Sequence, residues 1–117
     1  MRDGFRLAAT TLLVALITGS GCADEFMFWP RREFNAQEWK RTDEYHRYIF
    51  AKDLLDGKLI GLTREQIKAK LGTPSSEYPE GMDYIVKETS AGNFAIDFIY
   101  IRFDSKGKAS EAGLGAD

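Results

Sequence analysis

Apolar residues alternate with polar ones most regularly in the last third of the chain. Residues 82–88 predict one strand and residues 94–103 a longer one, because apolar side chains there recur at about every second position. A further short strand is expected at residues 108–111, after a turn that contains glycine. Connections this short join antiparallel neighbours, so we expect a three-stranded antiparallel meander.

The region before these strands has a helical spacing of apolar residues instead. Asn35 and Glu38 have the spacing of a capping box, and apolar residues between 43 and 56 fall along one side of a helix. We expect helix in this region, without requiring that it be continuous. Its single histidine, His46, has no second imidazole or cysteine nearby in the sequence, so a packed or exposed side chain is the preferred interpretation.

A second, shorter helix is predicted in the segment 61–74. Thr63 and Gln66 have the spacing in which each side chain bonds the other residue's backbone amide at a helix start. Ile67 and Leu71 supply an apolar stripe, after which a glycine and a proline stop the helix. A helix of about eight residues is not stable alone, so it must pack on the sheet. The residues that define this motif are Gly61, Thr63, Gln66, Leu71, Gly72 and Pro74.

The long predicted strand has two apolar faces. One face carries Phe94, Ile96, Phe98 and Tyr100, and we expect the helices to cover this face. Because Asp97 is polar, we assign the other face to partial contact with water. That face carries the candidate partner surface, which consists of Ile99, Ile101 and Phe103. Two accounts remain open: an aromatic residue of the tether or the loop 75–81 covers these side chains, or they dock a partner protein.

The first 21 residues have the layout of a signal peptide. Arg2 and Arg6 precede an apolar run over residues 7–17. The length of this run is well below the roughly 20 residues that span a bilayer as a helix. The run ends in small residues before Cys22, and this ending resembles a bacterial lipobox. We therefore expect Cys22 to be lipidated; the alternative is an ordinary signal peptide with a chance cysteine. Ala23 follows in place of the aspartate that retains lipoproteins in the inner membrane, which favours the outer membrane, facing the periplasm.

These boundaries divide the chain into four parts. Residues 1–21 are the lipoprotein signal peptide, residues 22–34 a lipidated tether, residues 35–111 the folded domain, and residues 112–117 a flexible tail. Phe26, Phe28 and Trp29 in the tether either lie at the lipid headgroup boundary or fold back onto the domain.

Composition narrows the possible chemistry. The chain has 117 residues, a formal net charge of -2, one cysteine and one histidine. Such a balance does not favour nucleic acid as a partner, and two soft ligands are too few for a typical zinc site. No glycine-rich phosphate loop and no paired nucleophile and base occur in the sequence, so we expect no catalytic residue, no metal and no cofactor.

Residues 59–111 resemble the SmpA/OmlA (BamE-like) family of outer-membrane lipoproteins. The resemblance is carried by the 61–74 motif, by Tyr84, and by residues 99–104 with Gly107 and Lys108. It implies an α+β fold of two N-terminal helices packed on a three-stranded antiparallel meander, an arrangement that also occurs in proteins that inhibit β-lactamase. The tyrosine-rich stretch that BamE proteins carry before the first helix is absent here.

The resemblance also implies a function. We expect a non-catalytic outer-membrane lipoprotein that binds envelope proteins, with outer-membrane protein assembly components as partners and the membrane reached through the lipid anchor. The alternative is a periplasmic inhibitor or ligand-binding module that has the same fold and no assembly role.

Overall fold

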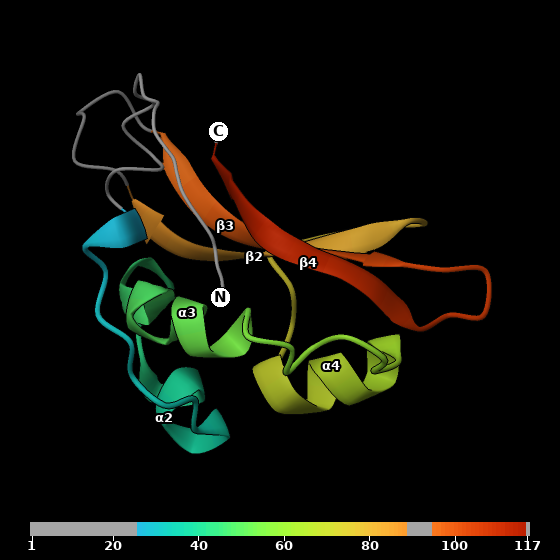
Figure 1. Cartoon of the computed structure of the whole chain (residues 1–117), viewed down its shortest axis with the longest axis horizontal. Coiled ribbons are helices and arrows are strands. Elements are labelled where there is room, and N and C mark those ends of the chain that lie inside the picture. Colours follow the sequence, from blue (N-terminus) through green and yellow to red (C-terminus); the bar gives the residue numbers. More distant parts are fainter. Residues whose placement is uncertain (1–25, 89–94, 117) are drawn as a thin grey trace, which may run out of the picture.

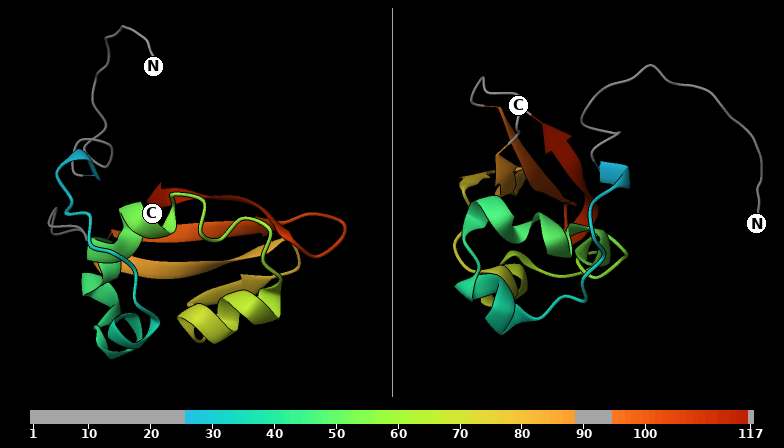
Figure 2. Two further views of the ribbon diagram at one scale, coloured as in Figure 1. Left: turned by 60° about the horizontal axis from the view of Figure 1, so that its bottom comes forward. Right: turned by 90° about the vertical axis from the view of Figure 1, so that its left-hand side faces the viewer.

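The computed structural model describes residues 26–88 and 95–116, and the predicted signal peptide and Cys22 lie outside this range. The fold is α+β, with helices gathered on one face of an antiparallel sheet (Figures 1 and 2). The helical elements are α2 (Ala36–Arg41), the 3-10 helix η1 (Glu44–Phe50), α3 (Ala51–Leu54) and α4 (Arg64–Leu71). The strands are β1 (Ser76–Tyr78), β2 (Gly81–Glu88), β3 (Ile96–Phe103) and β4 (Ala109–Ala116).

The sheet has four strands in the order β1-β2-β3-β4, so the predicted count of three is wrong. The extra strand is β1, a three-residue piece of the predicted loop 75–81 that pairs with the start of β2. Strand β4 is also longer than predicted, because residues 112–116, expected as a flexible tail, pair with β3. The antiparallel order of the strands is confirmed.

The motif at 61–74 folds as predicted. The Thr63 hydroxyl accepts a hydrogen bond from the Gln66 amide at 3.2 Å, and the Gln66 side chain accepts one from the Thr63 amide at 2.9 Å. Gly72 ends the helix with a φ of 86°, a conformation that favours glycine. Leu71 is buried in the core, so this short helix is stabilised by packing.

The first helical region is interrupted. Asn35 caps α2 through its side chain, as predicted. The expected helix over 43–56 is instead η1 followed by a single turn of α-helix, α3. Tyrosine, isoleucine and phenylalanine are modest helix formers, and the tighter 3-10 turn lets Phe50 pack into the core.

The core lies between the helices and the inner face of the sheet. Trp39 is fully buried there, and its indole nitrogen donates to the Leu71 carbonyl at 2.8 Å. The Tyr84 hydroxyl donates to the Gly72 carbonyl at 2.7 Å. Both bonds satisfy carbonyls at the C-terminal end of α4, which have no partner within the helix. Burial raises the pKa of the Tyr84 hydroxyl far above its usual range.

Candidate protein-binding site

The prediction that Ile99, Ile101 and Phe103 form a docking surface is wrong. Ile99 and Ile101 are both 0% exposed, and Phe103 is partly buried with the Arg64 guanidinium 4.6 Å from its ring centre. The predicted alternation of side chains is confirmed for residues 96–103, whereas Phe94 lies outside the described residues. The assignment of the two faces was inverted. Asp97 misled that assignment, because its side chain is also fully buried on the face that the helices cover.

No helix within residues 26–88 and 95–116 covers the opposite face of the sheet, which is the uncovered face. It carries four half-buried side chains: Ile85, Ile96, Phe98 and Tyr100. A hollow of about 200 Å³ lies at the β1 side of this face, bordered by Ile85, Ile96 and Phe98. The Tyr100 hydroxyl donates to Glu111 at 3.1 Å, and this hydrogen bond to a carboxylate raises the pKa of Tyr100.

Two glycines of β4 leave space for the aromatic rings of this face. A Cβ atom added at Gly113 would lie 2.6 Å from the Tyr100 hydroxyl, and one at Gly115 would lie 2.7 Å from the Phe98 ring. The rings thus lie over the two glycines and supply the contact that β4 lacks. Glycine weakens a strand by itself, so these rings help to explain why β4 forms.

One edge of the sheet is closed. Strand β1 has only three residues, and Arg64 at the start of α4 donates to the carbonyls of Tyr78 and Pro79 beside it, at 3.0 and 2.6 Å. Glu77 pairs with both Arg64 and Lys68, and its hydrogen bond to Lys68 lowers the pKa of Glu77. A three-residue strand whose last carbonyl and following turn are bonded by an arginine offers little for a further strand to pair with.

The other edge, β4, is eight residues long. At its beginning, the Gly61 amide donates to the Ala109 carbonyl and the Ala109 amide donates to the Leu62 carbonyl, both at 2.8 Å. Beyond that point, from Ala112 to Ala116, no other part of the described chain pairs with its outer side.

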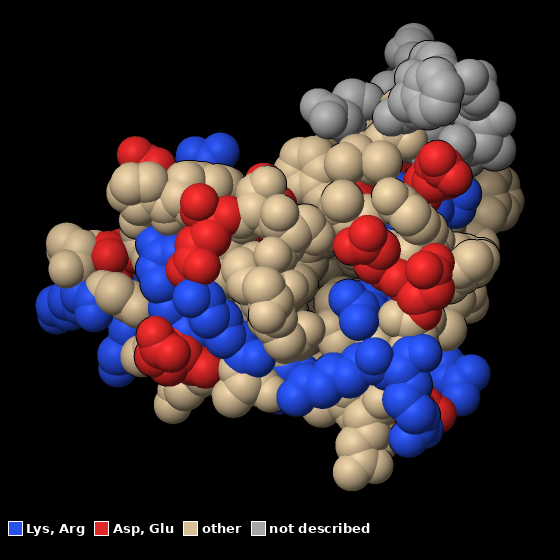
Figure 3. Space-filling model, turned by 180° about the vertical axis from the view of Figure 1, so that it is seen from behind, with Lys and Arg blue, Asp and Glu red and all other residues tan. Residues whose placement is uncertain are grey.

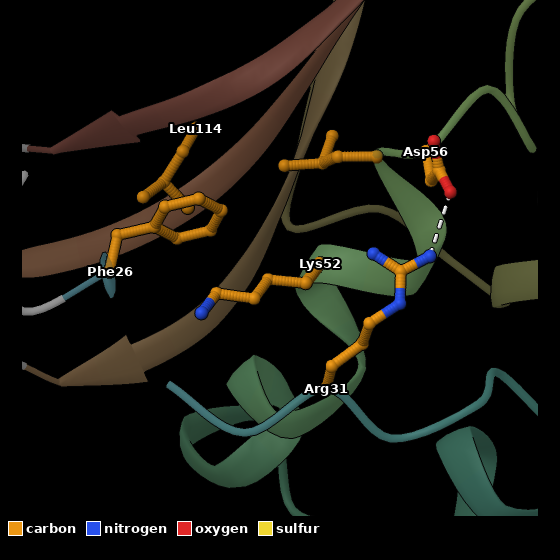
Figure 4. Close-up of a pocket in the computed structure, with 6 residues that line it drawn as sticks. Phe26, Arg31, Lys52, Asp56 and Leu114 are labelled. Atoms are coloured by element: carbon orange, nitrogen blue, oxygen red, sulfur yellow. Dashed lines mark hydrogen bonds and ion pairs between the residues drawn. The ribbon is translucent and has the colours of Figure 1, made fainter. Parts of the chain in front are cut away.

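A cleft lies beside this free stretch of β4. It has a volume of about 380 Å³ and is lined by Phe26, Arg31, Lys52, Leu55, Asp56 and Leu114. In Figure 4, Phe26 and Leu114 lie together at one end, the Lys52 side chain extends toward Phe26, and Arg31 reaches Asp56. The Arg31 to Asp56 ion pair measures 2.7 Å. The cleft therefore combines an apolar wall with a charged rim, a combination typical of sites that bind side chains.

The tether forms one wall of this cleft because it folds back onto the domain. Trp29 is 6% exposed and packs against Phe26 and Tyr48, with ring centres 5.3 and 5.4 Å away. Asp53 fixes the chain further on by accepting from the Phe34 amide at 2.7 Å. The folding-back alternative is thus confirmed for Phe26 and Trp29.

Two tether residues point away from the domain. Met27 is 71% exposed and Phe28 is 85% exposed, and both directly precede the buried Trp29. Few large apolar side chains of the described chain are this exposed. The headgroup-boundary alternative therefore stays a prediction for Phe28.

Charge elsewhere on the molecule is mixed. Figure 3 shows lysines and arginines interleaved with carboxylates on the face opposite to that of Figure 1. His46 is exposed and lies 3.1 Å from Asp43. Within residues 26–88 and 95–116, no three His, Cys, Asp or Glu side chains are grouped to hold a metal ion, and no helix has the length and apolar character needed to cross a bilayer.

No protein-family model, no curated protein and no solved structure matches this chain. The family resemblance of residues 59–111 thus stays a prediction.

Proposed function

We propose that this protein is a non-catalytic outer-membrane lipoprotein that binds other envelope proteins. Its anchor is Cys22, which follows an apolar run and small residues in the pattern of a lipobox. Its binding surfaces are the uncovered face of the sheet and the edge of β4. The resemblance of residues 59–111 to the SmpA/OmlA family favours a role in the assembly of outer-membrane β-barrel proteins or in envelope integrity.

The observation that carries this proposal is the short distance along the chain between Cys22 and the start of the folded domain. Only residues 23–25 separate Cys22 from Phe26, which already packs on the domain. Four peptide units extend at most about 14 Å. A lipid on Cys22 would therefore hold the domain against the membrane surface, with β4 and the cleft close to it.

The exposed tether residues are consistent with this placement. Met27 and Phe28 lie at the membrane-proximal end of the domain, where apolar and aromatic side chains enter the headgroup boundary. The buried Trp29 fixes their position. Each buried methylene of an acyl chain is worth about 0.8 kcal/mol, so a multiply acylated cysteine supplies the attachment and these two residues supply orientation.

The anchor is tested by mass spectrometry of the protein purified from membranes of a Gram-negative host. We expect a mature chain that begins at Cys22 and carries a diacylglyceryl group and an N-acyl chain. Cys22→Ser is the matched control, and it should remain unprocessed and unacylated. A wild-type chain cleaved at another residue and released in soluble form would contradict the proposal.

Partner binding is tested by crosslinking in native membranes. A photo-crosslinker in place of Phe98, on the uncovered face, should capture envelope proteins of the assembly machinery. The same group in place of Lys106, in an exposed turn, is the control. If the group at Phe98 repeatedly captures no envelope protein that the group at Lys106 does not also capture, protein binding by the uncovered face is contradicted.

The uncovered sheet face also favours a second candidate function. Half-buried Ile85, Phe98 and Tyr100 form an apolar surface of the kind that an inhibitor presents to an enzyme. In this case the mature protein would reduce the activity of an envelope enzyme in proportion to its concentration, and would do so equally well without its lipid. The assembly role, in contrast, requires the anchor.

A further inference from the structure

We infer that the free edge of β4 and the cleft beside it bind an extended segment of a partner protein by strand addition. One apolar side chain of the segment would enter the cleft, and an acidic side chain on the same face would pair with Lys52. This inference specifies how a partner is recognised, and it rests on the protein-binding part of the proposed function.

The register of the sheet identifies the free backbone groups. The Phe103 amide donates to the Glu80 carbonyl at 2.9 Å, so the amide and carbonyl of Phe103 face the β2 side. Backbone groups alternate along a strand, so those of Arg102, Tyr100 and Phe98 face β4. Their register partners Glu111, Gly113 and Gly115 face β3 in return. The alternate residues of β4 are Ala112, Leu114 and Ala116. Their amides and carbonyls therefore point away from the sheet.

Only an extended chain satisfies groups with this spacing. Outward pairs of donor and acceptor recur at every second residue, which matches another β-strand and no compact ligand. The molecule itself provides an example. The segment Gly61–Leu62 already pairs with the outer side of Ala109, at the start of the same edge.

The cleft supplies selectivity for side chains. Leu114 lies on the helix-covered face, as its register partner Ile99 does, and it forms part of the cleft wall with Phe26 and Leu55. Alternate side chains of an added strand would point to that same face. One of them therefore falls between Leu114 and Phe26, where a large apolar side chain would be removed from water.

Charge then favours an acidic neighbour. The Lys52 ammonium donates to the Met27 carbonyl at 3.0 Å and lies 5.5 Å from the centre of the Phe26 ring. No carboxylate within the described residues forms an ion pair with it, whereas Arg31 across the cleft pairs with Asp56. A carboxylate two residues from the apolar side chain would lie on the same face and reach Lys52.

A second copy of this chain fits less well. In a β4 to β4 pairing, the side chains that point to the cleft face are Ala112, Leu114 and Ala116, and none of them is acidic. Glu111 lies on the other face, where it accepts from Tyr100. A heterologous segment is therefore the occupant that we propose.

The experiment is a selection of nine-residue random peptides displayed on phage against the mature acylated chain in detergent micelles. We expect enriched peptides to carry a large apolar residue and an Asp or Glu two positions apart, with β-branched residues elsewhere. Synthetic peptides of the enriched sequence are then titrated by fluorescence anisotropy against the wild type and three variants.

The variants separate the two parts of the inference. Ala112→Pro removes one outward amide and should abolish binding. Lys52→Glu should weaken binding about two- to fivefold, and a peptide with Lys in place of its acidic residue should regain that loss. Lys106→Glu changes the net charge equally at a distance from the edge and should leave the affinity unchanged.

Three outcomes would overturn the inference. These are no enrichment, equal binding by Ala112→Pro, and self-association of the wild-type chain through β4 in sedimentation experiments. An acylated chain that crosslinks to envelope proteins but enriches no such peptides would refute strand addition and leave the proposed function intact. If the chain is not acylated in its host and the same selection on the unacylated chain still enriches such peptides, the lipid anchor of the proposed function is refuted and strand addition stands.

Discussion

The two edge strands of the sheet, β1 and β4, differ in how far they are protected from pairing with a further strand. At β1, the strand is three residues long, and Arg64 of α4 donates to the carbonyl of its last residue, Tyr78, and to that of Pro79 in the turn that follows. At β4, the strand is eight residues long, and within residues 26–88 and 95–116 its outer side is paired only near Ala109. Edge strands expose unpaired backbone groups, and proteins usually protect them by shortening or covering. Among the described residues, β4 is therefore left unpaired from Ala112 to Ala116, the stretch at which we propose strand addition.

The largest loss of stability is expected from truncation of a core side chain in α4. Leu71→Ala removes a fully buried side chain and should lower the free energy of unfolding by about 2 to 5 kcal/mol. Leu114→Ala, beside the open edge, deletes the same atoms from a half-buried position and should cost much less. Urea unfolding followed by tryptophan fluorescence measures both. Equal losses would mean that the two edges do not differ in packing.

A smaller effect is expected from the residue that closes the β1 edge. Arg64→Met keeps an apolar side chain over Phe103 but removes the hydrogen bonds to Tyr78 and Pro79. Bonds from a charged donor are each worth roughly 1.5 to 3 kcal/mol when buried, and partial exposure here should reduce the total to about 1 to 3 kcal/mol.

The control for Arg64 is Arg102→Met. Arg102 is exposed and lies 4.0 Å from Glu111, so its loss should change stability by less than about 0.5 kcal/mol. If the two variants were equally stable, Arg64 would not be what closes the β1 edge.

Much of the α4 region is predictable from sequence because its determinants are local. The Thr63 and Gln66 capping box and the stop at Gly72 depend on hydrogen bonds and backbone geometry within a few residues. The alternation along β3 is equally local. Each was predicted from residue spacing alone and is confirmed.

The open edge could not be predicted in this way. Residues 112–116 read Ala-Gly-Leu-Gly-Ala, which has little strand propensity, and the strand forms with Phe98 and Tyr100 of β3 lying over the glycines. The face of the sheet that the helices cover was also predicted wrongly, because the polarity of Asp97 indicated contact with water although its side chain is buried. The cleft joins residues 26 and 114, a contact that no local pattern signals.

Alkaline pH should destabilise the α4 side of the molecule through Tyr84. Burial raises the pKa of Tyr84 in the folded state, whereas the unfolded tyrosine ionises near its ordinary value of 10.0. The stabilisation is therefore complete below pH 10 and is lost as pH rises above it, by up to about 1.4 kcal/mol per pH unit. Urea unfolding at pH 8.5 and pH 11 measures the loss.

Tyr84→Phe is the control, because it has no ionisable hydroxyl. It should be less stable than the wild type at pH 8.5, having lost the bond to Gly72, and should show a smaller decrease between the two pH values. An identical decrease in both proteins would assign the alkaline effect to other groups, such as Tyr78, whose pKa is also raised, mainly by burial.

The smallest effect is expected at the open edge itself. The Ala112 amide faces away from β3, so Ala112→Pro removes a donor that has no partner among the described residues and should cost less than about 1 kcal/mol. Glu111→Pro, one residue earlier, deletes an amide that faces β3 and should cost about 1 to 3 kcal/mol beyond the effect of Glu111→Ala. Thermal unfolding of the three variants gives the difference. A loss at 112 as large as that at 111 would mean that the edge is already paired within the chain, and the two sheet edges would then be equally closed.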